Sequence, residues 1–207
     1  MIQASDLEVR PDEKGPKNLA ILLFLSSLIV AGMGWQDWQL HHDGLSDQQI
    51  ETFLATPNSQ PGEPTTVEQY RDFEADVREN NGYLLRGVSL LLASVCLLIG
   101  APMLYRLQRN GARLCTGGAL VGLVGGVAGS MTINNAAQTY LGDAMKLTYE
   151  IWVYLCGTMM GLCFAVAALP LLNVRARLAL YPRVSLNHEE EEYPFIPAWA
   201  ISLKAPS

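Results

Sequence analysis

Charged residues are scarce in this sequence, and they are almost absent from its four longest apolar runs. Only 16% of the 207 residues are charged, whereas 50% are hydrophobic. The runs cover residues 19–35, 84–105, 114–133 and 151–172, and Arg86 is the one charge inside them. Each run has close to the 20 or so residues that a helix needs to cross a hydrocarbon layer about 30 Å thick. The pattern predicts an all-α integral membrane protein with a four-transmembrane-helix bundle.

Cysteine is absent from every segment that connects these runs. The four cysteines, Cys96, Cys115, Cys156 and Cys163, all lie inside the runs. Cysteines in apolar segments usually pack as small apolar side chains, so we expect no disulfide. The alternative is a buried thiol cluster that holds a metal, but the spacings match no ligand pattern.

The motifs of common catalytic sites are also missing. The sequence contains no HExxH motif, no CxxC pair, no nucleophile elbow and no phosphate-binding glycine loop. We therefore predict that the protein is not an enzyme and has no cofactor. The one cluster with ligand chemistry is His41, His42 and Asp43, a candidate metal site, although adjacent histidines in an exposed segment are more often simply solvated. If the protein were instead a membrane enzyme, these three side chains would form its site.

Glycine is abundant where charge is missing. The third run carries a row of small residues at four-residue spacing, Gly118, Gly122, Gly126 and Ser130, with Gly125 and Gly129 beside it. The fourth run carries a similar row, Gly157, Gly161, Ala165 and Ala168. Such a row leaves a helix flank almost without side chains, so that another backbone can approach closely. We predict that the two rows face each other and hold the last two helices together.

Lysine and arginine are distributed unequally along the chain. Ten of the 14 lie near the two ends of the chain or in the connection 106–113, and the other four are Arg71, Arg78, Arg86 and Lys146. Because cytoplasmic segments carry the excess of these residues, this bias predicts a multi-pass protein of the cell membrane with both termini in the cytoplasm. The expected organisation is a cytoplasmic tail (1–18), a membrane domain (19–172) and a second cytoplasmic tail (173–207).

The segment 36–83 is expected outside the membrane and is strongly acidic. It contains ten acids, Asp37, Asp43, Asp47, Glu51, Glu63, Glu68, Asp72, Glu74, Asp76 and Glu79, against Arg71 and Arg78. This acidity argues against nucleic acid as a partner. Capping boxes at 46–49 and 65–68 predict two short helices, which makes this outer segment mostly helical. At its rim, Arg86 is expected to form an ion pair with Glu150 or with Asp37.

Two functions from different classes fit this organisation. The first is a scaffold or accessory subunit that packs, through its small-residue helix faces, against other membrane protein subunits or a second copy within the lipid bilayer. The second is a small channel or transport protein whose outer loop gathers cations. Its path would be lined by polar side chains from the runs, Ser94, Thr116, Ser130, Asn134 and Thr158. Convergence of these side chains on one path would favour the second function.

Overall fold

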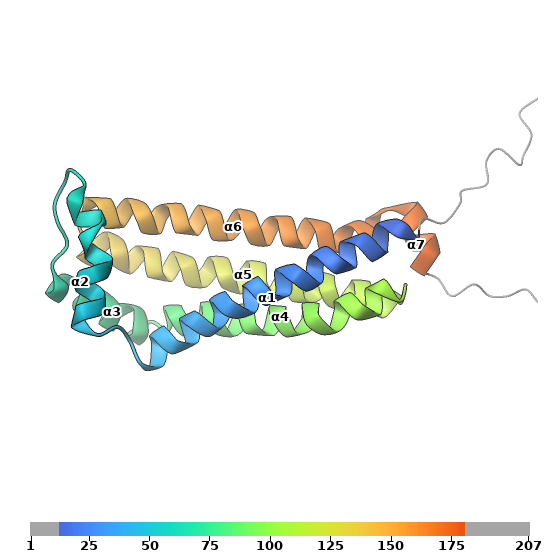
Figure 1. The fold of residues 1–207 in the computed structure, drawn as a ribbon, viewed down its shortest axis with the longest axis horizontal. Helices are drawn as coiled ribbons and strands as arrows, with labels where there is room; N and C mark the ends of the chain where they lie inside the picture. Colours follow the sequence, from blue (N-terminus) through green and yellow to red (C-terminus); the bar gives the residue numbers. More distant parts are fainter. Residues whose placement is uncertain (1–12, 181–207) are drawn as a thin grey trace, which may run out of the picture.

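The computed structural model describes residues 13–180, and within this range all regular secondary structure is helical. Four long helices run side by side: α1 (Lys14–His42), α4 (Gly82–Tyr105), α5 (Arg109–Tyr140) and α6 (Asp143–Leu172) (Figure 1). A helical cap covers one end of this bundle and consists of α2 (Asp47–Ala55), the 3-10 helix η2 (Pro57–Ser59) and α3 (Val67–Glu79). The last helix, α7 (Val174–Leu180), lies at the opposite end, which we call the tail end.

Each of the four long helices is long and apolar enough to cross a membrane. The helices extend past the apolar runs of the sequence, because polar residues continue the helical hydrogen bonding at both ends. Helix α1 begins at Lys14, inside the segment expected as a tail, with Pro16 in its first turn where a proline removes no helical hydrogen bond. Helix α7 occupies the start of the second expected tail. The remainder of the two tails, 1–12 and 181–207, lies outside the described residues.

The two helices of the cap begin at capping boxes. In α2, the Ser46 amide donates to Gln49 Oε1 at 2.9 Å, as the sequence predicted. In α3, the Thr66 amide donates to Gln69 Oε1 at 2.8 Å, so this box starts one residue later than predicted. The reason is that Thr65 has another role: its hydroxyl accepts a hydrogen bond from the backbone amide of Gly142 at 2.9 Å, which ties the cap to the start of α6.

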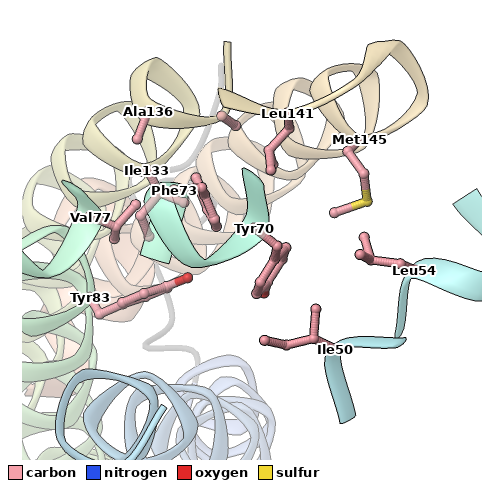
Figure 2. Close-up of a cluster of buried hydrophobic side chains, with 11 residues drawn as sticks. Ile50, Leu54, Tyr70, Phe73, Val77, Tyr83, Ile133, Ala136, Leu141 and Met145 are labelled. Carbon is pink, nitrogen blue, oxygen red and sulfur yellow. The ribbon is translucent and has the colours of Figure 1, made fainter. Parts of the chain in front are cut away.

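The cap is fixed to the bundle by a hydrophobic core of its own. Figure 2 shows Tyr70, Phe73 and Val77 of α3 packed over residues at the ends of α5 and α6. The other members of this core are Ile50, Leu54, Tyr83, Ile133, Ala136, Ala137, Leu141 and Met145. Because α2, α3, α4, α5 and α6 all contribute side chains, the cap has a defined position on the bundle.

Removing the α3 capping box should cost a modest amount of stability. We expect Thr66→Ala to lower the free energy of unfolding by about 1 kcal/mol, because the Gln69 amide loses its hydroxyl acceptor. Denaturant unfolding in detergent micelles measures this. The control is Thr139→Ala on α5, which removes an exposed hydroxyl bonded only to the carbonyl of Asn135 in its own helix. Equal effects of the two substitutions on the free energy of unfolding would argue against a stabilising role of the capping box.

The small-residue row of α5 packs mainly against α4, whereas the sequence predicted the small-residue row of α6 as its partner. A Cβ atom added to Gly129 would lie 2.8 Å from the backbone nitrogen of Arg86, and one added to Gly122 would lie 2.8 Å from Cβ of Ala93 and 2.5 Å from Cε of Met160 on α6. In the same row, Gly118 meets Cys96 and Gly125 meets Ser89 of α4, and Gly126 lies between Leu90 of α4 and Cys156 of α6. Helix α4 is the partner because it presents small side chains on this face and is joined to α5 by a tight turn.

The corresponding row on α6 does not meet the small-residue row of α5. A Cβ atom added to Gly161 would meet nothing within 4 Å, and one added to Gly157 would meet only the side chain of Val127, at 3.6 Å. Ala165 is exposed. Helix α6 turns larger side chains toward the bundle, among them the buried Met160. The predicted face-to-face pairing of the two rows is therefore wrong.

Candidate functional site

Helix α1 crosses the bundle obliquely and contacts different helices at its two ends (Figure 1). Near the tail end, Ala20 and Leu23 share a buried cluster with Ala167 of α6. Near the cap, α1 lies on α4, where a Cβ atom added to Gly34 would be 3.0 Å from the carbonyl oxygen of Gly87. Helices α1 and α6 therefore diverge toward the cap.

A cavity of about 710 Å³ lies between the diverging helices and beneath the cap. We call it the cap cavity. Amide and hydroxyl side chains contribute to its wall, namely Gln36, Gln48, Gln49, Thr52 and Thr148. Aromatic rings form much of the rest, namely Phe53, Tyr70, Tyr83, Tyr149 and Trp152. Its size is in the range of about 300–1,000 Å³ that is usual for small-molecule sites.

The wall of the cap cavity also contains an ion pair that joins α1 to α4. Arg86 Nε donates to Asp37 Oδ2 at 2.7 Å and Arg86 Nη2 donates to Asp37 Oδ1 at 2.6 Å. The side chains of Arg86 and Asp37 are 19% and 6% exposed, so the pair is largely withdrawn from solvent. Two parallel charge-assisted hydrogen bonds are the strongest arrangement for such a pair. Glu150, the other predicted partner of Arg86, lies on an exposed position of α6 and does not form this contact.

The connection between α1 and the cap is held by a buried carboxylate. Glu74 accepts hydrogen bonds from Arg71 Nη1 and from Arg78 Nη2, each at 3.1 Å. It also accepts from the backbone amide of Leu45 at 3.1 Å. Arg71 in turn bonds to Asp47 of α2 at 2.6 Å. This network fixes α2 and α3 relative to the end of α1, and so fixes the roof of the cap cavity.

Tyr70 supplies a hydroxyl to the cap cavity from α3. Burial raises the pKa of this phenol above its ordinary value. The group therefore remains protonated at neutral pH and keeps an O–H that can donate a hydrogen bond. The cavity thus offers donors as well as acceptors.

The histidines predicted as metal ligands do not converge with Asp43. The ring of His42 stacks on Trp38 with centroids 4.5 Å apart, and its Nδ1 donates to the carbonyl oxygen of Trp38 at 3.0 Å. His41 meets His42 edge-on at 5.1 Å. Between residues 13 and 180, no group of three or more His, Cys, Asp or Glu is placed to hold a metal ion. The predicted site of His41, His42 and Asp43 is therefore not formed in this part of the chain.

The polar side chains predicted to line a transport path are scattered. Ser94 donates to the carbonyl oxygen of Leu91 in its own helix at 2.8 Å. Thr116 donates to two carbonyl oxygens, those of Ala112 and Ala167, each at 2.9 Å. The other three differ in exposure: Ser130 is buried, Asn134 is half-buried and Thr158 is exposed. None of the five lines the cap cavity. They do not form the continuous path that a channel needs.

Comparisons of this chain with protein-family models, with curated proteins and with solved structures gave no match. The interpretation of the cap cavity therefore rests on its own geometry and chemistry.

Proposed function

We propose that this protein is an integral protein of the cell membrane that crosses the bilayer four times and has a non-enzymatic role as an accessory subunit or scaffold. We further propose that it holds one amphipathic molecule from the bilayer in the cap cavity. The observation that carries the proposal is the position of this cavity: it lies where α1 and α6 diverge, between a polar cap and the apolar part of the bundle.

The surface of the bundle supports insertion into a bilayer. Large apolar side chains point outward on each of the four long helices, for example Leu22, Leu92, Val124 and Leu162, which are all more than half exposed. A belt of this kind around a whole bundle is unfavourable in water, but lipid chains solvate it, and helices satisfy their backbone hydrogen bonds internally.

The charges at the two ends support one orientation. The tail end carries Arg106, Arg109 and Arg113 beside the turn from α4 to α5, with Arg175 and Arg177 on α7. The segment 36–83, which includes the cap, carries ten of the 20 acidic residues of the chain against two arginines. By the positive-inside bias, the tail end faces the cytoplasm and the cap and its cavity lie outside.

The lining of the cap cavity indicates the kind of molecule that fits. Asp37 and Arg86 cancel each other's charge, and the remaining polar groups are amides and hydroxyls. This environment suits a head group that is uncharged or zwitterionic and can form hydrogen bonds. The half-exposed Met33 and Trp152 border the side between α1 and α6, where an apolar tail would leave the cavity. A membrane lipid with such a head group has both the polar part that fits the cavity and the apolar tail that would leave it.

A transport role is less well supported by the same geometry. On α1 and α6 the cap cavity extends no deeper than Met33 and Cys156, both in the half of the bundle nearer the cap.

A non-catalytic role is supported by the ion pair, because Asp37 and Arg86 satisfy each other and do not present a free base or nucleophile.

The proposal is tested by counting bound lipid. Native mass spectrometry of the protein released from phosphatidylethanolamine nanodiscs should show one retained lipid per chain. Trp152→Ala should reduce this retention at least about tenfold, since losing the contact of one large aromatic side chain with a ligand costs about 2 kcal/mol. Thr52→Trp should also reduce it, because the larger ring would project from α2 into the cavity.

The matched control is Trp35→Ala on α1. Trp35 and Trp152 are 57% and 50% exposed, but only Trp152 lines the cavity. Retention should therefore be unchanged in Trp35→Ala. Equal loss in both tryptophan variants, or full retention in Thr52→Trp, would refute a lipid in the cap cavity.

A further inference from the structure

A tyrosine at the start of α4 has a buried hydroxyl without a hydrogen-bond partner. Tyr83 is 3% exposed, and its ring points from α4 toward Tyr70 of α3 (Figure 2). Between residues 13 and 180, no group forms a hydrogen bond with the Tyr83 hydroxyl. Buried polar groups are nearly always hydrogen-bonded, so this hydroxyl calls for an explanation. Because Tyr83 lines the cap cavity, a molecule in that space can supply the missing partner.

The guanidinium of Arg86 offers a second donor at the same place. Arg86 follows Tyr83 by about one turn of α4 and lines the same cavity. Asp37 accepts hydrogen bonds from Nε and Nη2 of Arg86, whereas Nη1 has no partner between residues 13 and 180. The charge of Arg86 is compensated, but the N–H groups of Nη1 are still available. A guanidinium can only donate, so the ligand group that meets both side chains must be an acceptor.

A phosphate group fits these two side chains. A phosphodiester has two charged oxygens that can accept, and hydrogen bonds from a guanidinium to phosphate are among the strong ones in proteins. Asp37 is the only acid that lines the cavity between residues 13 and 180, and Arg86 already neutralises it. Because that ion pair is neutral, the charge of the phosphate has to be balanced within the ligand. A zwitterionic head group does so through its own ammonium group.

We propose that Tyr83 and Arg86 hold the phosphate of a zwitterionic phospholipid in the cap cavity. This inference rests on the function proposed above and narrows it, since an uncharged lipid such as diacylglycerol has no phosphate. The ammonium group would lie against α2, where Gln48 offers an amide oxygen and Phe53 an aromatic face. Phe53 is 45% exposed although it lines the cavity, which leaves its ring available for this contact.

The experiment uses the full chain in nanodiscs that contain phosphatidylethanolamine and diacylglycerol with the same acyl chains, and native mass spectrometry counts each retained lipid. The wild type should retain phosphatidylethanolamine over diacylglycerol by at least about tenfold. Tyr83→Phe keeps the ring and removes only the hydroxyl. We expect it to weaken retention of phosphatidylethanolamine about tenfold, the usual effect of losing a hydrogen bond to a charged group, and to leave retention of diacylglycerol unchanged.

The matched control is Tyr105→Phe on the same helix. Tyr105 is 50% exposed and does not line the cap cavity, so this variant should retain both lipids as the wild type does. A second measurement separates binding from folding. In lipid-free detergent, Tyr83→Phe should be at least as thermally stable as the wild type, because it removes a buried hydroxyl that has no partner in the described part of the chain. Lower stability there would indicate a structural role and overturn the proposal.

The outcomes separate this proposal from the one on which it rests. If Trp152→Ala loses phosphatidylethanolamine but Tyr83→Phe retains it, lipid binding stands and the phosphate position is wrong. Equal retention of the two lipids by the wild type would also overturn the phosphate position and favour an uncharged head group. Retention of neither lipid by the wild type would refute both proposals.

A final arm distinguishes a lipid head group from free phosphate, which has the same chemistry. Inorganic phosphate is titrated into the wild type and Tyr83→Phe while thermal stability is followed. We expect no stabilisation of either protein. Stabilisation of the wild type alone, with equal retention of phosphatidylethanolamine by both proteins, would show a site for free phosphate and overturn the lipid as its source.

Discussion

Replacing Asp37 with leucine is expected to lower the free energy of unfolding by about 3–5 kcal/mol, the usual cost of leaving one charge of a buried pair without its partner. Asp37 is 6% exposed and accepts both hydrogen bonds from Arg86. In Asp37→Leu the guanidinium of Arg86 would remain between α1 and α4 with no counter-charge. Unfolding in mixed detergent micelles, followed by circular dichroism, measures the loss.

Two controls separate the ion pair from a general loss of charge. In the double variant Asp37→Leu/Arg86→Leu, most of the stability should return, because no unpaired charge remains. Glu150→Leu removes an exposed acid from α6 and should change stability by no more than about 0.5 kcal/mol. If Asp37→Leu behaves like Glu150→Leu, or if the double variant is as unstable as the sum of the two single variants, the pair does not join α1 to α4.

Replacing Gly129 with leucine is expected to separate α4 from α5. The glycine faces the backbone of α4, where an added Cβ atom would lie 2.8 Å from Arg86 N and 3.0 Å from Arg86 Cα. Backbone atoms cannot move aside as a flexible side chain can. We expect a loss of about 3 kcal/mol or more, at the upper end of the cost of overpacking. The ion pair of Arg86 with Asp37 would be displaced as well, which adds to the loss.

Glycines on the surface of the same bundle provide the control. Added Cβ atoms on Gly117 of α5 and Gly161 of α6 would meet nothing within 4 Å. Gly117→Leu and Gly161→Leu should therefore be neutral or slightly stabilising, since leucine favours a helix by a little under about 1 kcal/mol relative to glycine. Strong destabilisation by Gly161→Leu with little effect of Gly129→Leu would restore the originally predicted pairing of α5 with α6.

The all-helical architecture could be predicted from the sequence because long apolar runs leave few alternatives. Runs of this length and composition form helices, and a turn as short as that between α4 and α5 makes its flanking helices antiparallel neighbours. The ends of the helices were harder to predict. Helix α1 continues through Gln36, Asp37 and Trp38 to His42, well beyond the apolar run that ends at Trp35. Hydropathy marks where a lipid layer could lie, and hydrogen bonding decides where the helix stops.

The partner of a glycine row could not be predicted from the row alone. The similar rows on α5 and α6 predicted that the two rows pair with each other, yet the α5 row packs mainly on α4. What decides is the shape of the opposing face, and α4 presents Ser89, Ala93 and Cys96 there. These residues are spaced three to four apart in the sequence, so α4 also has a row of small side chains, although it is not marked by glycine.

The cap cavity cannot be predicted from the sequence, because its lining residues come from five helices. Asp37 was assigned to the outer loop, although it continues a regular series of buried positions on α1 that includes Ser27, Val30 and Gly34. Their spacing of three and four residues places Asp37 on the face that packs against α4. That register could have indicated Arg86 as its partner. The cavity itself depends on how α1 and α6 diverge, which is a tertiary property that no local pattern encodes.

The central claim, that the chain crosses the bilayer four times with the cap outside, is tested most directly by labelling single cysteines in intact cells. Ser59→Cys in the cap and Gln108→Cys in the turn between α4 and α5 are both exposed positions. In a background with the four native cysteines replaced, a membrane-impermeant maleimide should label Ser59→Cys at once. Gln108→Cys should be labelled only after the membrane is permeabilised. Equal labelling of both positions in intact cells, or labelling of Gln108→Cys alone, would contradict the proposed orientation and the four passes on which it depends.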